Sequence, residues 1–155
     1  MRVVLKRVGK APELVEIDID NRDFGAYDEV RKLIGAKYID KMGIGMGSGL
    51  YLFVGELAEG ANFNIKTNNP YFPVQTIMGD CALVRCLNDE GWAVFGDMTE
   101  NELELMKALV EMNDVKVAEY TNKSRENLTQ EEIDLLEEEL NIQRQMMNML
   151  MGFGR

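Results

Sequence analysis

The chain has 155 residues, the length of one domain or of one domain with an appendage. Hydrophobic residues make up 46% of it, which is enough for a core and excludes an intrinsically disordered protein. Its complete lack of histidine excludes the commonest general base and every Ser-His or Cys-His nucleophile. We therefore expect a protein that is no enzyme and that carries no cofactor and no metal.

The net charge of −10 is concentrated in one segment. Between Asp97 and Glu139 there are 14 acidic and 4 basic residues, which leaves 13 of each sign in the rest of the chain. Binding to a nucleic-acid backbone needs a basic surface, so we expect no direct nucleic-acid binding. An acidic segment is instead suited to a basic protein surface or to solubility.

Nothing in the chain predicts a membrane or secreted protein. No stretch approaches the roughly 20 apolar residues that a spanning helix needs, and residues 1–7 lack the apolar run of a signal peptide. We expect a cytoplasmic protein of a bacterial host cell. Cys81 and Cys86 would lie about 16 Å apart on one strand, too far for a disulfide, so we expect two reduced, buried thiols.

The first 55 residues predict mainly strands. Residues 2–8 and 13–19 flank the turn-forming Gly9–Pro12, and the second of them alternates in polarity, so we expect an antiparallel hairpin. A helix is expected over 26–34, where apolar residues recur at helical spacing and Gly35 follows. Two further strands are expected at 36–42 and 50–54.

Four glycines, Gly43, Gly45, Gly47 and Gly49, separate those last two strands. A phosphate-binding glycine loop must lead into a helix, whereas this one leads into Leu50–Val54, a strand. We therefore expect a hairpin loop, with a flap over a partner or ligand as the alternative.

Residues 56–95 predict an irregular excursion followed by a hairpin. The excursion, 56–69, is rich in glycine, asparagine and charge, with a short strand expected at 62–66. Gly79 and Asp80 interrupt the stretch from Pro73 to Arg85 before a clear strand at 81–87. A turn at 88–91 and a return strand at 92–95 complete the hairpin.

Two capping boxes predict the helices that follow. Thr99 with Glu102 begins a helix over 98–112, and Thr129 with Glu132 begins one that runs to about Met151. The segment between them, 113–128, is predicted to be a linker, with an edge strand at 115–117 as the alternative.

The last helix carries two candidate surfaces. Six acidic residues could bind a partner: Glu131, Glu132, Asp134, Glu137, Glu138 and Glu139. Five apolar residues occupy a and d positions of a heptad interrupted by Gln143: Ile133, Leu136, Leu140, Met147 and Leu150. This stripe could pack on its own domain, or pair with a second copy to give a homo-oligomer or with a partner helix. Methionine at its end suits an adaptable contact.

These elements predict an α+β fold: a mostly antiparallel sheet with two packed helices, plus a long C-terminal amphipathic helix. We divide the chain into a core domain over 1–112, a linker or edge strand over 113–128, and a C-terminal helix over 129–155 for packing or oligomerisation.

Residues 1–112 resemble the bacterial and phage family called domain of unknown function 3846. The features that carry the resemblance are Gly9–Pro12 before Glu16–Asp18, Leu33–Gly35 before Tyr38–Ile39, Ile77–Cys81 before a strand, and Gly91–Phe95 before the Thr99 helix start. The resemblance does not cover the tail from Asn113. It implies a small α+β protein typical of phages and conjugative elements, whose accessory proteins often interfere with host systems.

Our leading functional hypothesis is a phage or mobile-element accessory protein that binds a protein. It would inhibit a host defence nuclease, in the manner of an anti-CRISPR or anti-restriction protein, by presenting acids in place of phosphates. One alternative is a small-molecule or nucleotide-binding module, with a pocket between the glycine loop, residues 68–72 and Gln75 or Asp80. A third is an enzyme in which Asp80, Asp97 and Glu56 hold a divalent ion.

Overall fold

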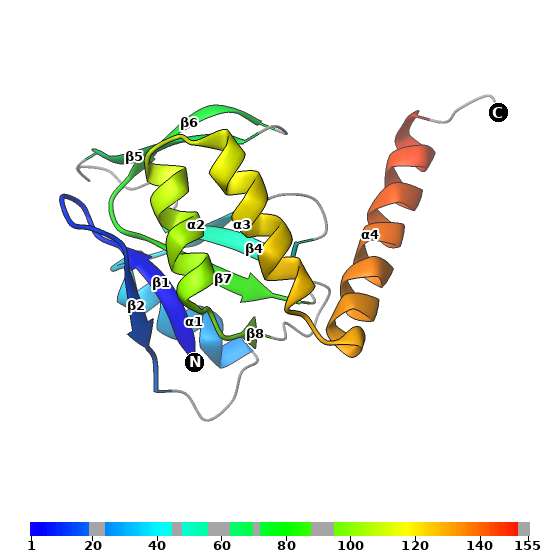
Figure 1. Ribbon diagram of the computed structural model, residues 1–155, viewed down its shortest axis with the longest axis horizontal. Helices are drawn as coiled ribbons and strands as arrows, with labels where there is room; N and C mark the ends of the chain where they lie inside the picture. The colour runs from blue at the N-terminus through cyan, green and yellow to red at the C-terminus, as the bar shows by residue number, and fades with distance from the viewer. Residues whose placement is uncertain (19–23, 45–47, 56–62, 70–71, 88–94, 152–155) are drawn as a thin grey trace.

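The computed structural model describes residues 1–18, 24–44, 48–55, 63–69, 72–87 and 95–151 (Figure 1). Its strands are β1 (Arg2–Lys6), β2 (Glu13–Glu16), β3 (Ile39–Gly43), β4 (Leu50–Gly55), β5 (Phe63–Asn69), β6 (Phe72–Met78), β7 (Cys81–Cys86) and β8 (Phe95–Gly96). Its helices are α1 (Phe24–Leu33), α2 (Glu100–Val110), α3 (Asp114–Glu126) and α4 (Gln130–Met151).

A six-stranded antiparallel sheet forms the centre of the molecule. Its order is β2-β1-β7-β4-β3, and β8 pairs with the end of β7. Strand β7 is buried along its whole length and pairs with β1 and β4 in registers that set Leu83 opposite Val4 and Leu52. The predicted hairpins β1–β2 and β3–β4 are confirmed, as is the α+β fold.

Helices cover both faces of this sheet (Figure 1). Alternate strand residues therefore enter two separate cores, because successive side chains of a strand point to opposite faces. On one face, Val30 and Ile34 at the end of α1 pack with Phe53. On the other, Leu105 and Met106 of α2 pack with residues such as Leu52 and Leu83. Strand β4 is apolar on both faces for this reason.

Strands β5 and β6 form a separate two-stranded sheet that lies against α2 (Figure 1). The sequence predicted an irregular excursion over 56–69 with a short strand at 62–66, and it predicted no strand between Pro73 and Gly79. The structure instead has two strands of seven residues each, joined across their length from Phe63 opposite Met78 to Asn69 opposite Phe72.

The prediction for residues 113–128 was wrong, because the structure forms helix α3 there. The Asn113 side chain caps it by accepting a hydrogen bond from the Lys116 amide at 3.2 Å. Val115, which suggested an edge strand, is 79% exposed, while Val117 and Tyr120 pack toward the α2 core. The packing surface offered by α2 thus decides the structure of this weakly apolar segment.

Helix α4 extends away from the sheet and from the α2–α3 pair (Figure 1, orange to red). It begins with the predicted capping box: the Thr129 amide donates to Glu132 Oε1 at 2.9 Å and the Glu132 amide donates to Thr129 Oγ1 at 3.2 Å. Neither α4 nor any other helix within the described ranges combines the length and apolarity needed to cross a membrane.

Candidate functional site

The glycine loop and α4, two surfaces singled out from the sequence, meet at one corner of the sheet. A β-carbon on Gly49 would lie 3.0 Å from Leu136 Cδ2 and 3.5 Å from Leu87 Cδ2. Gly49 also has a φ of +71°, a conformation that favours glycine. Glycine here therefore lets α4 dock, and Leu136 is only 3% exposed as a result.

Backbone and hydroxyl contacts close the base of the β3–β4 hairpin. The Ile44 amide donates to the Leu50 carbonyl at 2.9 Å, and the Leu50 amide donates to Ser48 Oγ at 3.1 Å. The Ser48 hydroxyl itself donates to the Ile44 carbonyl. Gly43 is the last residue of β3, whereas Gly45 and Gly47 lie outside the described residues. A role as a flap therefore stays a prediction.

A buried charge pair lies behind this corner. Arg85 of β7 is 4% exposed and Glu102 of α2 is 2% exposed, and their Nη2 and Oε1 atoms lie 3.8 Å apart. The Arg85 guanidinium also donates to the Ser124 hydroxyl of α3 and, at 3.3 Å, to the Ser48 carbonyl. Burial lowers the pKa of Arg85, and the charges of Glu102 and Glu132 oppose that shift.

Glu102 serves the cap of α2 and the buried pair together. It accepts hydrogen bonds from the Thr99 amide at 3.0 Å and from Asn101 Nδ2 at 2.9 Å. Asn101 also donates to the Tyr120 carbonyl at 2.9 Å, which links the start of α2 to α3. The sequence predicted this capping box, but not its pairing with Arg85.

One signal in the sequence could have revealed the pair. Arg85 lies between Val84 and Cys86 in a strand that is otherwise apolar on both faces. A charged residue in such a strand needs a buried partner of opposite charge. Gly96 of β8 makes room for it, since a β-carbon there would lie 2.9 Å from Arg85 Cδ.

The acidic residues of α4 face solvent for the most part. Glu132 is half-buried, whereas four others are exposed: Glu131, Asp134, Glu137 and Glu138. The side chain of Glu139 lies outside what the structure describes. The structure thus places four of the six predicted partner-binding acids on an open helix face.

On the other helices several acids pair with a base three or four residues away, whereas the acids of α4 have no base at that spacing. Asp28 of α1 pairs with Arg31 at 2.6 Å. On α2, Glu104 pairs with Lys107 at 3.1 Å, and on α3 Glu119 pairs with Lys123, also at 3.1 Å. Along the described part of α4 no ion pair forms, because Arg144 is its only base and has no acid three or four residues away. The negative charge of α4 is therefore not compensated within the helix.

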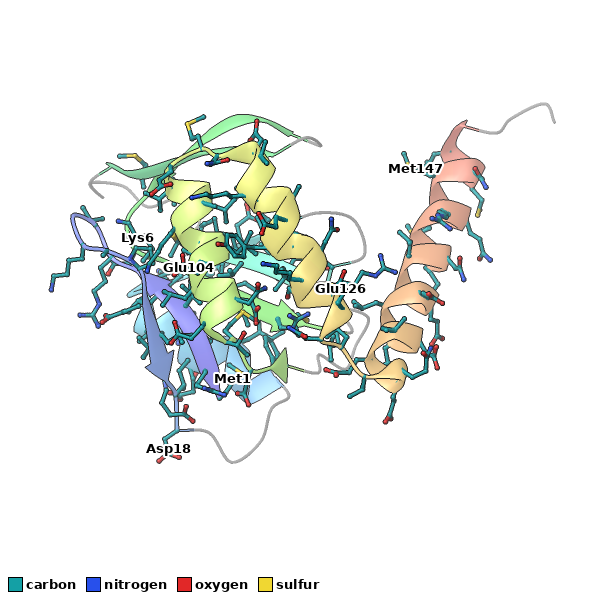
Figure 2. All side chains as sticks on the ribbon, viewed as in Figure 1. Met1, Lys6, Asp18, Glu104, Glu126 and Met147 are labelled. Carbon is teal, nitrogen blue, oxygen red and sulfur yellow. The ribbon has the colours of Figure 1, made fainter. Side chains whose placement is uncertain are left out.

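The heptad stripe of α4 is divided between two environments. Leu136 is buried against its own domain, and Ile133 and Leu140 are half-buried. Beyond them Met147 is 58% and Leu150 is 71% exposed, and Figure 2 shows Met147 on the part of α4 farthest from the sheet. The sequence left packing and pairing as alternatives. The structure shows packing for the first half and leaves the distal half open.

Neither Cys81 nor Cys86 forms a disulfide, and both are buried, as predicted. Burial raises the pKa of Cys81 to about 12, because the thiolate would be poorly solvated at that position. Cys81 therefore stays protonated at physiological pH and is an unreactive core residue.

Two carboxylates proposed for the alternative functions, Asp80 and Asp97, lie far apart. Asp80 accepts from the Val8 amide, just beyond one end of β1, and Asp97 accepts from the Arg2 amide at the other end, so the length of the strand, about 13 Å between its end residues, separates them. Asp80 also precedes β7, whereas Gly49 contacts the far end of that strand, at Cys86. Asp80 and Asp97 therefore cannot share one ion, and Asp80 does not line a pocket with the glycine-loop corner. Glu56, the third proposed carboxylate, lies outside the described residues, and among those described no three His, Cys, Asp or Glu side chains converge as metal ligands.

Comparison with protein-family models, with curated proteins and with solved structures gave no match. The resemblance of residues 1–112 to the domain of unknown function 3846 family thus stays a prediction from the sequence motifs.

Proposed function

We propose that this protein is a non-enzymatic accessory protein of a phage or mobile genetic element that acts by binding a protein in the bacterial cytoplasm. The proposed partner is a host protein that binds nucleic acid, such as a nuclease of a CRISPR or restriction system. Its basic groove would receive the acidic face of α4. The observation that supports this proposal is the exposed, uncompensated charge on α4.

The spacing of these acids suits a surface that normally binds phosphates. From Glu131 to Glu138 the helix rises about 10 Å, at 1.5 Å per residue. The four exposed carboxylates in this span give about one negative charge per 3.5 Å. A strand of DNA carries about one per 3.4 Å. A groove lined with lysine and arginine for a single strand would therefore meet a similar charge density on α4.

The open end of α4 adds a second kind of contact beside the acids. Met146, Met147, Met149 and Leu150 are all exposed. Methionine side chains re-pack easily against an irregular apolar surface. In the proposed complex the acids speed association and fix orientation, while the apolar end slows dissociation.

A charge-reversal experiment tests the acidic surface. The double variant Glu137→Lys, Glu138→Lys changes the net charge from −10 to −6. The control Glu13→Lys, Glu111→Lys makes the same change at exposed positions outside α4. Each protein is immobilised and used to capture partners from host extract, and the captured protein is identified and assayed for nuclease activity.

We expect the wild-type protein and the control to capture and inhibit the same nucleic-acid-binding protein. The α4 variant should capture at least tenfold less of that protein. Capture should also weaken as salt is raised, since the contact is electrostatic. Equal capture by the α4 variant and the control, with circular dichroism confirming that both are folded, would show that this acidic face is not the binding surface.

A further inference from the structure

Arg85 joins three parts of the chain that are remote in sequence. Its guanidinium contacts Glu102 of α2, Ser124 of α3 and the carbonyl of Ser48 at the start of β4. Of the residues of α3, all of which the structure describes, Ser124 alone is buried. The bond to Arg85 is therefore the deepest attachment of α3 to the rest of the molecule.

The same corner also holds α4. Gly49, next to Ser48, faces Leu136 of α4, since a β-carbon on Gly49 would lie 3.0 Å from Leu136 Cδ2, and the Gly49 carbonyl accepts a hydrogen bond from the Cys86 amide at 2.7 Å. The corner formed by Ser48 and Gly49 is thus linked to α3 through Arg85 and to α4 through Leu136. Because α4 follows α3 after a short connection at Asn127–Thr129, the two helices form one continuous α3–α4 segment.

We infer that Arg85 is a latch that couples the docking of the α3–α4 segment to the closure of the Ser48–Gly49 corner. When Ser124 leaves Arg85, α3 keeps only partly buried contacts with α2, through residues such as Val117 and Tyr120. The guanidinium then lacks one of its buried hydrogen-bond acceptors, and this loss weakens its hydrogen bond to the Ser48 carbonyl. Undocking of the helices and opening of the corner therefore favour each other.

This coupling works in both directions, because the free energy that links two sites is reciprocal. A contact that pulls α4 from the sheet would loosen the β3–β4 corner, and a contact that opens the corner would release α4. The coupling does not depend on the proposed partner, and we expect it in the isolated protein.

Two single substitutions on α3 separate the latch from an ordinary loss of helix stability. Ser124→Ala removes the acceptor of the Arg85 bond. Thr121→Ala is the matched control, because it removes a hydroxyl of the same helix that donates to the Val117 carbonyl within α3. Native-state hydrogen exchange, followed residue by residue by NMR, then reports the opening of each element.

For Ser124→Ala we expect exchange at least tenfold faster in α3, in α4 and at the corner amides of Ile44, Leu50 and Cys86. Exchange at Val4 in β1 should not change. Thr121→Ala should leave the corner amides as in the wild type. The inference is wrong if Ser124→Ala accelerates α3 alone, or if both variants give the same pattern.

A double substitution guards against a trivial global effect. Arg85→Met, Glu102→Gln replaces both buried charges with neutral side chains, so that no ion is left unpaired, and it removes the links from the guanidinium to Ser124 and Ser48. We expect it to accelerate exchange in α3, α4 and the corner amides together. Faster exchange by one common factor throughout the molecule would instead indicate global destabilisation and contradict the inferred coupling.

Discussion

At the scale of single residues, the buried pair of Arg85 and Glu102 constrains how α2 packs on β7. Removing an ion from water costs several kcal/mol, which a partner and further hydrogen bonds must offset. Glu102 accepts bonds from Thr99 and Asn101, and Arg85 donates to two serines, so both ions have further polar contacts. The pair therefore fixes how α2 sits on β7, because neither charge can move away alone.

Substituting one ion should be far more costly than substituting an exposed acid of the same helix. For Glu102→Leu we expect a loss of about 3–5 kcal/mol in the free energy of unfolding, because Arg85 loses its counter-charge and α2 loses half of its capping box. Glu104→Leu, which removes an exposed pair with Lys107, should cost under about 1 kcal/mol. Urea unfolding of both variants gives the comparison, and similar losses would contradict the role assigned to the pair.

At the scale of elements, the features that depend on neighbouring residues were predicted from the sequence, whereas those that depend on contacts between distant elements were not. Each capping box spans only four residues, Thr99 to Glu102 and Thr129 to Glu132, and the structure contains both. Helix α3 was missed because its few apolar residues, among them Val117 and Tyr120, are too sparse to predict a helix without the surface of α2. The partner of Arg85 was missed for a related reason: it lies on another element, at no fixed spacing in the sequence.

The Asn113 cap stabilises the start of α3. Asn113→Ala should lower the free energy of unfolding by about 1 kcal/mol, because the Lys116 amide loses its acceptor. The control is Asn122→Ala in the exposed middle of the same helix, where alanine has the higher helix propensity and the change should be neutral or slightly stabilising. If the two substitutions have equal effects in urea unfolding, the cap does not stabilise α3.

At the scale of the whole molecule, the structure joins the two surfaces that the sequence set apart. The glycine loop and α4 are more than 80 residues apart in sequence, yet Leu136 lies so close to Gly49 that a β-carbon there would be 3.0 Å from Leu136 Cδ2. No periodicity in the sequence could show this contact, since it depends on how the α3–α4 segment returns to the sheet. It also explains why one apolar stripe contains both a buried leucine and exposed methionines. One side of the first half of α4 packs on the domain through Leu136, whereas Met147 and Leu150 of the second half are exposed.

This division of α4 makes stability and assembly depend on different residues. Leu136→Ala should cost about 2–3 kcal/mol in unfolding free energy, because a buried leucine leaves a cavity. The double variant Met147→Glu, Leu150→Glu should change stability by less than about 0.5 kcal/mol, because both side chains are exposed. If a second copy pairs through the open half, sedimentation should show a dimer for the wild type and for Leu136→Ala at a concentration where the glutamate variant is a monomer. A wild-type protein that stays monomeric up to millimolar concentration would exclude self-pairing and leave the open end of α4 for a different protein.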